Sequence, residues 1–571
     1  MKTLETQEYL IDQMPNITGA TRAAIDLEMF GQDKERLHIP HGKFACLSVA
    51  LDNGRNYIYT NTLVLDEVFW MLKPLQWIIQ NATYDIRQLR QFVKIEPHPI
   101  FDPMLVEKVL WGGYYVTFGL SSMVRRYLGL YMAKDKYEEL RDESINRAEL
   151  FQYNVQDAVL TLKVAEIQQA LLEEQPDTKK VYEIIDAPMI WVVLDMEPTR
   201  VNIQGWLELA TENESKGRSI EAEIGLNVYA YTKVKDHLAL HYGLRLENTQ
   251  DETLAEYKHI PIIQKIREAR SYRKMSSTYG RKWVEKHCDE DGNVVADWHV
   301  TGAETGRQSS SNPSLMNIPA AKMPIFRTLF IPRYDQMIVA DVSQQEPRIT
   351  ALMSKDKALV KAFNDHEDIH LFIARTIFDD FTIQKSDIRR KIGKRTGLGI
   401  VYGFTAVGLS SKLKEEIDDP TFEINEDKAQ EYIDAYFRKF PRVKIMLDQL
   451  VAFGHRHEYV TTAFGRRCWI NIHAMGWENN CKNSPFQGGG ADMTKLWQVK
   501  LWERCRNGGH RYPLVMPIHD ELVLDVSDDE VPMYLDLLGA AFKETIQILF
   551  PDSPIPFEFE HFEGANWGVK A

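Results

Sequence analysis

Two short apolar runs, each ending near an aspartate, are the most informative feature of the hydrophobic pattern. Asp341 ends the run in QMIVADVSQQEPR, and Asp520 follows the run in PLVMPIHDELVLDV. Runs of this length and composition predict buried strands. A carboxylate at the end of a buried strand is costly unless its charge is compensated, and a shared pair of metal ions compensates two such carboxylates. The pattern therefore predicts that two distant segments meet at one metal site.

A basic segment between these aspartates, RRKIGKRTGLGIVYG, predicts a helix with a phosphate-binding face. Steps of four keep side chains near one face of a helix. The side chains at these steps are Arg390, Lys394, Leu398 and Tyr402. Two cations suit a triphosphate, and the apolar and aromatic residues suit its base and sugar. The alternative is an amphipathic helix with a basic rim, and for this helix considered alone that interpretation is the favoured one. His370, just upstream, is a further phosphate ligand or a structural histidine.

The residues after each aspartate refine the metal site. Asp341 begins the pattern D-x-S-Q-x-E-x-R, which Ser343, Gln344, Glu346 and Arg348 complete. The alternative is a strand end followed by a helix with an acidic first turn. In HDE, Asp520 and Glu521 point to opposite faces if the segment is extended. We therefore expect Asp520 to dominate metal binding there.

The first 170 residues predict an α/β domain with a second acidic site. AAIDLEM and FACLSVALDNGRNYIYT read as strands, and helical patterns follow from about residue 76. Period two places Asp26 and Glu28 on one face of a strand. Two helical patterns each carry a pair four residues apart, which are Asn81 with Asp85 and Tyr153 with Asp157. Four acids, with a tyrosine one turn before the last, indicate a second two-metal arrangement.

Composition narrows the class of protein. A chain of 571 residues is too long for a single hydrophobic core, so several domains are expected. Its content of 44% apolar and 26% charged residues is ordinary for a soluble globular protein. No apolar run is long enough to span a bilayer, and the start lacks the apolar core of a signal peptide. We therefore expect a cytoplasmic protein without a membrane partner. The five cysteines are scattered without a C-x-x-C pair, which predicts reduced thiols and no zinc site.

The net charge of −14 does not exclude a nucleic-acid partner, because local fields bind phosphates. Basic residues cluster at 270–283, 389–395 and 454–467. Each cluster alone is more often a solvated face than a binding site. Three of them around the predicted metal site favour a polyanionic partner.

At this point the chain resembles the DNA polymerases of family A over nearly its whole length. The motifs that carry the resemblance occur in the family's order and spacing: TGRQSSSNPSLMNIP (305–319), DVSQQEPR (341–348), RRKIGKRTGLGIVYG (389–403), QGGGAD (487–492) and HDE (519–521). The resemblance implies a multidomain α/β and α+β protein, with an RNase H-like exonuclease domain at 1–175 and a right-hand polymerase domain at 176–571. The thumb would cover about 200–300, the palm about 301–355 and 440–571, and the fingers about 356–440.

The resemblance also implies roles at the polymerase site. Asp341 and Asp520 would hold two Mg²⁺ ions, for which Mn²⁺ could substitute, and Glu521 would be a further catalytic acid beside them. Lys394 would protonate the leaving group, and Glu346 would block a ribose 2′-hydroxyl. The dNTP would contact Arg390, Lys394, Leu398, Tyr402, His370, Glu346 and Gln344. The primer–template would contact Arg307, Asn483, Gln487, His519, Arg348, Lys274, Ser277 and Thr278.

The N-terminal acids resemble those of the DEDDy class of 3′→5′ proofreading exonucleases. By that resemblance, Asp26, Glu28, Asp85 and Asp157 hold two metal ions, and Tyr153 orients the attacking water. Because all four acids are present, we expect an active proofreader.

Two positions depart from the family pattern. Leu398 stands where phenylalanine or tyrosine is usual, which predicts altered dideoxynucleotide incorporation. Asn479 stands where arginine is common, so one contact to the primer terminus or template is expected to be missing or replaced.

The compact layout, without room for a 5′-nuclease domain ahead of residue 20, resembles phage replicases, which would place the protein in a bacterial host's cytoplasm. We expect a monomer that binds primer–template DNA and dNTPs; helicase, primase or single-strand-binding partners are not identifiable.

Two other functions compete with a proofreading DNA polymerase. A single-subunit RNA polymerase has a related palm, but Glu346 at the sugar-gate position and the exonuclease-like part argue against it. A catalytically silent nucleic-acid-binding protein predicts the loss of at least one metal-binding acid, and every such acid is present.

Overall fold

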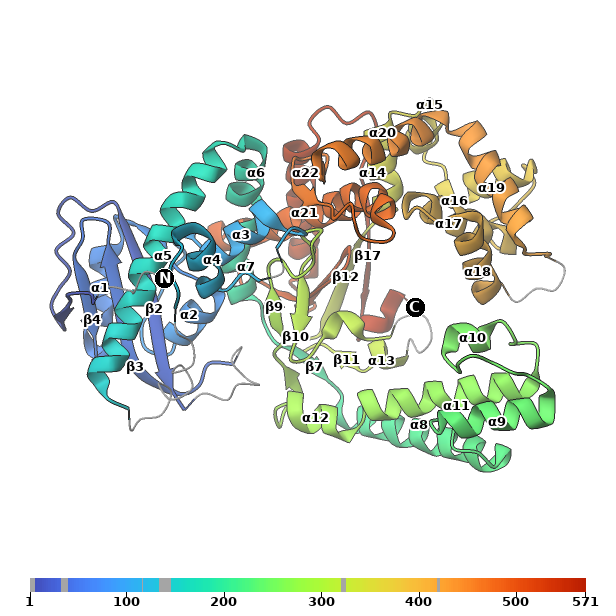
Figure 1. The fold of residues 1–571 in the computed structure, drawn as a ribbon, viewed down its shortest axis with the longest axis horizontal. Coiled ribbons are helices and arrows are strands. Elements are labelled where there is room, and N and C mark those ends of the chain that lie inside the picture. The colour runs from blue at the N-terminus through green and yellow to red at the C-terminus, as the bar shows by residue number, and fades with distance from the viewer. Residues whose placement is uncertain are drawn as a thin grey trace.

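The computed structural model describes residues 6–31, 39–115, 117–132, 145–319, 325–417 and 422–570. An N-terminal part with its own sheet lies beside a larger part, in which two helical arms extend from a central sheet (Figure 1). We call residues 203–287 the first arm and residues 357–439 the second arm.

The N-terminal part is built on a six-stranded mixed sheet with the order β1-β4-β3-β2-β5-β6. The antiparallel strands β2, β3 and β4 adjoin β5 and β6, which run parallel to β2. The predicted strands are confirmed as β2 and β3 with β4. The strands are β1 (Leu10–Ile11), β2 (Arg22–Phe30), β3 (Lys43–Leu51), β4 (Asn56–Tyr59), β5 (Gln76–Ile78) and β6 (Ile100–Phe101).

A long helix, α5 (Arg147–Glu173), packs across β2 and β3 and confirms the predicted helix over Tyr153 and Asp157. Asn146 caps its start, and the buried residues of α5 include Leu150, Val155 and Ala158. The remaining helices of this part are α1 (Leu65–Leu72), α2 (Ala82–Leu89), α3 (Pro103–Trp111) and α4 (Leu120–Leu128).

The connection between the two parts is anchored by buried charges. It contains α6 (Pro176–Val181) and α7 (Met189–Asp195). Between them Asp186, fully buried, forms ion pairs with the Arg466 guanidinium, at 2.8 Å, and with Lys495. Breaking such a buried pair strands an uncompensated charge, so this network fixes the connection to the central part.

The central sheet is antiparallel, with the order β15-β16-β12-β17, and α21 and α22 pack together beside it (Figure 1). The buried positions of β12 and β15 are all apolar, as the sequence predicted for the runs before Asp341 and Asp520. The elements here are β12 (Gln336–Val342), β15 (Leu514–Ile518), β16 (Glu521–Val526), β17 (Phe559–Gly564), α20 (Pro441–His457), α21 (Trp477–Asn507) and α22 (Val531–Leu549).

Smaller sheets connect the central sheet to its surroundings. A three-stranded sheet contains β7 (Thr199–Val201), β8 (Asn293–Val294) and β11 (Phe330–Ile331), and one hairpin pairs β9 (Asp297–His299) with β10 (Ser309–Ser311). A second hairpin pairs β13 (Tyr459–Thr461) with β14 (Arg467–Trp469). The short helix α13 (Ile325–Thr328) precedes β11.

Aspartate caps set the start of several helices in the second arm. Asp356, Asp368 and Asp387 each accept backbone N–H groups at the first turn of α15, α16 and α17. The helices here are α14 (Gln345–Ser354), which links the arm to β12, α15 (Lys357–Asn364), α16 (Ile369–Phe378), α17 (Ile388–Val401), α18 (Ala406–Glu416) and α19 (Glu426–Lys439).

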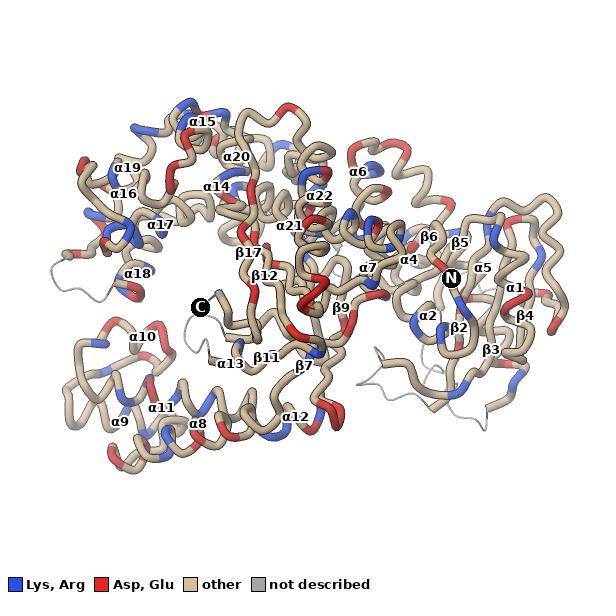
Figure 2. Tube along the Cα trace, turned by 180° about the vertical axis from the view of Figure 1, so that it is seen from behind, with Lys and Arg blue, Asp and Glu red and all other residues tan. Residues whose placement is uncertain are grey.

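The first arm is helical and its tip touches the second arm. Its helices are α8 (Ile203–Ile224), α9 (Tyr231–Tyr242), α10 (Asp251–Ala255), α11 (Pro261–Thr278) and α12 (Arg281–His287). The helix α10 lies opposite α18 in both views (Figures 1 and 2). Lys258 Nζ donates to the Lys414 carbonyl at 2.6 Å, and a cavity of about 710 Å³ lies between the two arms at this contact. The arms therefore meet across the side of the molecule away from the N-terminal part.

Charge is mixed over the surface, with basic and acidic residues on every part of the molecule (Figure 2). The net charge of −14 therefore does not form one acidic face. Among the helices that the structure describes, none combines the length and apolarity needed to cross a lipid bilayer.

Candidate active sites

One cavity of about 570 Å³ gathers most of the residues predicted for nucleotide chemistry. It lies where β12, α14, α17 and the β15–β16 turn meet. The predicted residues that line it are Arg307, Asp341, Gln344, Glu346, His370, Arg390, Lys394, Leu398, Tyr402, His519 and Asp520. Segments separated by more than half of the polymerase-like part thus converge on one space.

Strand pairing places Asp341 next to Asp520. The strand β12 lies between β16 and β17, so that Asp341 is opposite Glu521 on one side and Glu560 on the other. Two residues connect β15 to β16, and Val342 N donates to the carbonyl of Asp520 at 3.2 Å. Short hairpins fix register tightly, so the β15–β16 turn holds Asp520 at the end of β12.

Two residues that line this cavity have a left-handed backbone conformation. Gln344 has φ +52° before α14, and His519 has φ +59° in the β15–β16 turn. This region is disfavoured for residues other than glycine, and such strain persists where the surrounding structure enforces it. Both turns therefore aim specific groups at the cavity at a cost in backbone energy.

The carboxylates here suit a divalent cation. Burial raises the pKa of Asp520, while nearby His519, Arg307 and Lys394 lower it in part. Of the residues that the structure describes, none forms an ion pair with Asp520. Asp341, Asp520 and Glu560 all line the cavity and offer the hard oxygen ligands that Mg²⁺ prefers. Across the described ranges no three His, Cys, Asp or Glu side chains are grouped closely enough to hold a metal ion by themselves.

The opposite wall of the cavity holds Glu346 in place. The Tyr402 hydroxyl donates to Glu346 at 2.8 Å, and an Arg307 N–H donates to the same carboxylate at 3.0 Å. Burial and the Glu346 charge raise the pKa of Tyr402, so this hydroxyl keeps its proton. The carboxylate is therefore fixed by two donors from different segments.

The cationic wall comes from α17, packed closely on α16. A Cβ at Gly393 would lie 2.6 Å from the carbonyl of His370, so only glycine allows this approach. Arg390 donates to Asp368 at 2.7 and 2.9 Å, while Lys394 lines the cavity. Burial, with Lys394 next, lowers the pKa of His370 to about 4. His370 is therefore neutral near pH 7 and acts as a hydrogen-bonding group.

Two predicted residues lie outside the cavity with their side chains engaged elsewhere. Glu521, 5% exposed, accepts from Trp567 Nε1 at 2.5 Å and lies 3.5 Å from Arg327. Arg348, also 5% exposed, donates to the Ser343 carbonyl and to Glu558, each at 2.8 Å. Their contacts support the strand and helix that carry Asp520 and Glu346, and the Arg348 guanidinium is engaged within the protein.

Other predicted DNA contacts lie along helices that border the cavity. Asn483 and Gln487 are on α21, near Gly490 and Ala491 of the cavity wall. Asn479, on the first turn of α21, packs against Gly403 just after α17. The family departure at Asn479 therefore lies next to the second arm.

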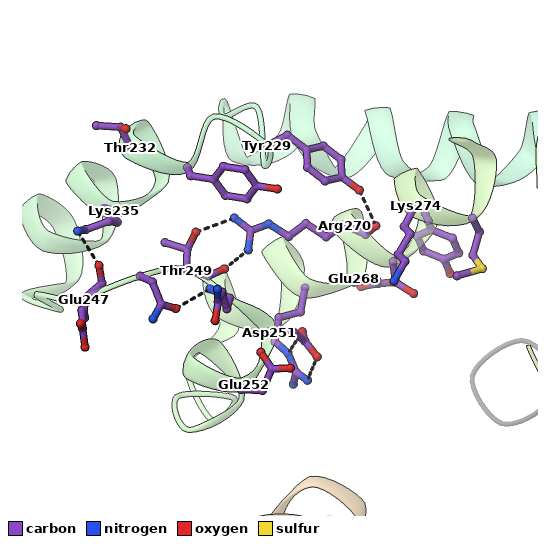
Figure 3. Close-up of a pocket in the computed structure, with 17 residues that line it drawn as sticks. Tyr229, Thr232, Lys235, Glu247, Thr249, Asp251, Glu252, Glu268, Arg270 and Lys274 are labelled. Carbon is purple, nitrogen blue, oxygen red and sulfur yellow. Dashed lines mark hydrogen bonds and ion pairs between the residues drawn. The ribbon is translucent and has the colours of Figure 1, made fainter. Parts of the chain in front are cut away.

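Lys274, Ser277 and Thr278 lie on α11, where Lys274 borders a wide hollow of about 1060 Å³ in the first arm (Figure 3). Arg270 crosses this hollow to Thr249, and its N–H groups bond to backbone carbonyls and to the Thr249 hydroxyl (Figure 3). Several acids share the lining, which are Glu247, Asp251, Glu252 and Glu268. These acids repel phosphate, so the smaller cavity is the better nucleotide site.

A second acidic site lies in the N-terminal part. Asp26 and Glu28 come from β2, Asp85 from α2, and Asp157 with Tyr153 from α5. Burial raises the pKa of Asp26 well above its usual range, and the charges of Asp157, Asp85 and Glu28 raise it further. The four acids are thus near enough to repel one another.

The acidic site also fits a bound cation. Burial, then the charges of Glu28 and Asp102, raises the pKa of Asp85, whose Oδ2 is buried without a hydrogen-bond donor among the described residues. The Asn154 amide donates to Asp26 at 2.5 Å and is the main neutral support of the cluster. Mutually repelling buried carboxylates are stabilised by divalent cations.

Sequence reasoning missed three residues with clear positions. Glu560 lines the cavity beside Asp341, Asp368 holds Arg390, and Asn154 holds Asp26. The alternation in FEFEHFEG could have indicated Glu560. Asp368 before an apolar helix is a recognisable N-cap, but its bond to Arg390 leaves no signal in the sequence.

Comparison with known proteins decides the family. Residues 220–569 match the family model described as DNA polymerase family A. The chain belongs to DNA polymerase family A. Residues 5–173 match the model of a 3′-5′ exonuclease. The predicted order, an exonuclease domain with a mixed sheet followed by a Pol I-like polymerase domain, is confirmed.

Relatives of this family A chain include bacterial proteins named DNA polymerase I. That of Chloroflexus aurantiacus is 29% identical over 445 residues, which are 73% of this chain and 46% of the relative. One from Thermus thermophilus, named as thermostable, is 30% identical over 525 residues, 87% of this chain and 58% of the relative. That of Pseudomonas aeruginosa is 26% identical over 551 residues, which are 88% of this chain and 58% of the relative. The chain spans about half of the length of such relatives.

A solved structure shares the fold of this family A chain. It is titled the POL domain of Pol1 from M. smegmatis in complex with DNA primer-template and dNTP. The two agree with a TM-score of 0.82 at 20% identity and cover 97% of each chain. The whole arrangement of sheets and arms is therefore one that this fold adopts.

Proposed function

We propose that this family A chain is a DNA-directed DNA polymerase that extends a primer 3′-hydroxyl with dNTPs and removes nucleotides from primer 3′ ends. One observation carries the proposal: a single cavity holds two strand-end carboxylates, a cationic helix and a fixed Glu346. Carboxylates for metal, cations for phosphate and a wall for the sugar are the parts that nucleotidyl transfer needs.

At the polymerase site, Asp341 and Asp520 would hold two Mg²⁺ ions, with Mn²⁺ able to substitute. When bound, the ions supply charge neutralisation at the phosphates and favour ionisation of the 3′-hydroxyl. Arg390 and Lys394 would bind the triphosphate, and Lys394 would give a proton to the departing pyrophosphate. His370, neutral, would donate one hydrogen bond.

The same cavity would select the nucleotide. Tyr402 and Leu398 would contact the nascent base pair, and Glu346 would exclude a ribose 2′-hydroxyl because its carboxylate cannot move away from Tyr402 and Arg307. Gln344 would complete the wall beside it. This fixed carboxylate favours a DNA polymerase over a single-subunit RNA polymerase.

Primer–template DNA would lie between the arms. His519, Arg307, Asn483 and Gln487 would contact its end through minor-groove acceptors that all correct pairs share. Lys274, Ser277 and Thr278 of the first arm would contact the duplex backbone, which makes binding salt-dependent. The domain boundary would lie near residue 175, with the first arm as thumb, the second arm as fingers and the central sheet as palm.

At the N-terminal site, Asp26, Glu28, Asp85 and Asp157 would hold two divalent ions, and Tyr153 would orient the water that attacks the terminal phosphodiester. Asn154 would keep Asp26 in register with the other acids. A monomeric state stays a prediction. The relatives named above are bacterial, so the predicted phage-like origin gains no support from them.

Steady-state extension of a primed DNA template tests this function. Wild type should use dNTPs far better than ribonucleotides in the presence of Mg²⁺. Asp520→Asn, which keeps size but removes charge, should lower kcat by about a hundredfold or more, because metal ions contribute several kcal/mol. Glu521→Gln is the matched control and should retain most of kcat. Equal use of both sugars, or full activity of Asp520→Asn, would refute the proposal.

A further inference from the structure

The outer face of the β13–β14 hairpin carries aromatic and cationic side chains. Tyr459 pairs with Trp469 in register, and Thr461 pairs with Arg467. Side chains alternate along strands, so Tyr459, Arg467 and Trp469 share one face while Val460 and Cys468 are buried on the other. Most of the hairpin lies within the basic cluster at 454–467, to which the proposed function assigns no role.

Rings from three segments continue this face. Trp111 stacks on Trp469 with centroids 5.3 Å apart, and Tyr114 meets Trp469 at 5.1 Å. At the other end Phe453 meets Tyr459 at 5.5 Å. We name these five residues, Trp111, Tyr114, Phe453, Tyr459 and Trp469, the aromatic ladder. Tyr114 is 54% exposed and Phe453 39% exposed, so the ladder is open to solvent at both ends.

The ladder carries a cation that has no acidic partner. The Arg467 guanidinium lies 4.2 Å from the Tyr459 ring centroid and 5.6 Å from that of Trp469. Within the described ranges it forms no ion pair, although Glu458 and Glu478 are exposed acids on nearby segments. Its Nε is buried without an acceptor among these residues. An arginine stacked on rings and lacking a carboxylate is suited to a phosphate.

A chain of contacts runs from the wall of the nucleotide cavity toward the ladder. Gly403 follows the cavity residue Tyr402 and packs on Asn479, because a Cβ there would lie 3.2 Å from the Asn479 Cα. Trp477, at the start of α21, meets the His455 ring at 5.5 Å, just after Phe453 of the ladder. From there the ladder extends to residues 111–114 of the N-terminal part. The helices α3 and α20, which pack against the hairpin, lie on one side of the central sheet in Figure 1, and the first arm, to which we assign the duplex, lies on the other.

We propose that the aromatic ladder with Arg467 binds the unpaired template strand ahead of the nascent base pair; this rests on the proposed function. Bases stack on aromatic rings regardless of sequence, and cations between the rings contact the backbone. Exposed Arg456 adds a positive charge along α20, beside the exposed rings of His455 and His457. The duplex occupies the opposite side, so the strand that reaches the ladder is the one still unpaired.

Packing between the two parts of the molecule explains only some of these contacts. Trp469 Nε1 donates to the Leu110 carbonyl at 2.8 Å and, with the half-buried Trp111, joins the parts. Tyr114 also meets Trp469 across this junction but is 54% exposed, while Phe453 and Arg467 contact rings of the larger part. These three residues therefore separate binding from packing in an experiment.

The test is equilibrium binding of Tyr114→Ala and Arg467→Gln to two primer–templates. One has a template overhang of about 12 nucleotides, within the span of single-strand sites, and the other a single-nucleotide overhang. We expect each variant to bind the long overhang roughly fivefold or more weakly than wild type, from the loss of one stacking or phosphate contact, with the short overhang unaffected. Trp70→Ala, an aromatic 74% exposed on α1, is the control and should change neither.

Each other outcome overturns the proposal. Equal weakening on both substrates would mean that the ladder only joins the parts of the molecule. Unchanged binding of the long overhang would mean that the surface is not a strand site. A defect confined to a primer with an unpaired 3′ tail would assign the ladder to the primer strand. If wild type neither binds nor extends either substrate, the proposed function fails instead.

Discussion

The Tyr402 hydroxyl lies 2.8 and 3.0 Å from the two oxygens of Glu346, which an Arg307 N–H also reaches at 3.0 Å. Three motifs far apart in the chain thus meet at one carboxylate. Because the donors come from the end of α17 and from the loop before β10, a shift of the second arm changes the contacts of Glu346. Sugar selection and arm position are therefore physically coupled in this molecule.

Tyr402→Phe should relax sugar selection. The variant removes one donor from Glu346 but leaves Arg307, so the carboxylate gains freedom without losing its charge. We expect the ratio of kcat/KM for ribonucleotides to that for dNTPs to rise by roughly fivefold, the equivalent of one neutral hydrogen bond of about 1 kcal/mol. Glu346→Ala should raise the ratio further. The ratio for Glu346→Gln should lie between those for Tyr402→Phe and Glu346→Ala. An unchanged ratio in Glu346→Ala would show that this residue does not select the sugar.

His370 should contribute to dNTP binding without titrating near neutral pH. Its pKa is lowered to about 4, so it stays neutral as pH rises from ~5.5 to ~8, where an ordinary histidine would lose its charge. His370→Ala should therefore raise KM for dNTPs by a factor that is constant over this range. Steady-state profiles of both proteins provide the measurement. A ratio of KM values that changes with an apparent pKa near 6.5 would contradict the neutral assignment.

Divalent ions should stabilise the N-terminal part against heat. The raised pKa values of Asp26 and Asp85 mean that acid stabilises the metal-free fold, and that this stability is lost as pH rises through the folded-state values. Mg²⁺ at roughly a hundredfold above its Kd should add about 2.7 kcal/mol, seen as a higher unfolding temperature.

Asp85→Asn separates this effect from general salt. It removes one repelling charge and one ligand, so the metal-free protein should unfold at a higher temperature than wild type while its response to Mg²⁺ shrinks. Calorimetry with and without Mg²⁺, at constant ionic strength, measures both. A variant that is less stable than wild type without metal and equally responsive to Mg²⁺ would show that these acids do not form a cation site.

The Lys258 contact between the arms should slow DNA entry. Its Nζ donates to the Lys414 carbonyl, which closes the space between α10 and α18. Lys258→Met keeps the aliphatic length and removes the donor, so association with a primer–template should become about twofold to fivefold faster, as one exposed contact is worth at most about 1 kcal/mol. Stopped-flow fluorescence measures this rate.

A lysine with the same kind of bond inside one arm is the control. Lys235 Nζ donates to the Glu247 carbonyl at 2.9 Å within the first arm. Lys235→Met should leave the association rate near that of wild type. If both variants associate with DNA equally faster than wild type, the cause is the loss of a surface charge and not the opening of the contact between the arms.

Much of the fold and of both sites followed from local patterns. Apolar runs predicted β12 and β15, and steps of four predicted α17. The expected separation of Asp520 and Glu521 assumed an extended segment, whereas Asp520 lies in the turn before β16; it lines the cavity, and Glu521 contacts Trp567. These patterns are legible because burial of one face repeats along the chain at the period of the element.

Contacts between segments that are distant in the chain could not be predicted from the sequence. Arg348 belongs to a motif that suggested DNA, yet Glu558 and Phe363 surround its guanidinium. Arg390 forms its pair with Asp368 across two helices, and no sequence period links them. Such pairings are decided by how helices pack in three dimensions, so the residue types were predicted better than their partners.

One measurement tests the central claim, that two separate acidic sites extend and shorten a primer. A 5′-labelled primer–template is incubated with Mg²⁺, with and without dNTPs, using wild type, Asp520→Ala and Asp157→Ala. Wild type should extend with dNTPs and shorten without them; Asp520→Ala should lose only extension, and Asp157→Ala only shortening. Loss of both activities in either variant would contradict separate sites, and absence of both in wild type would contradict the proposed function itself.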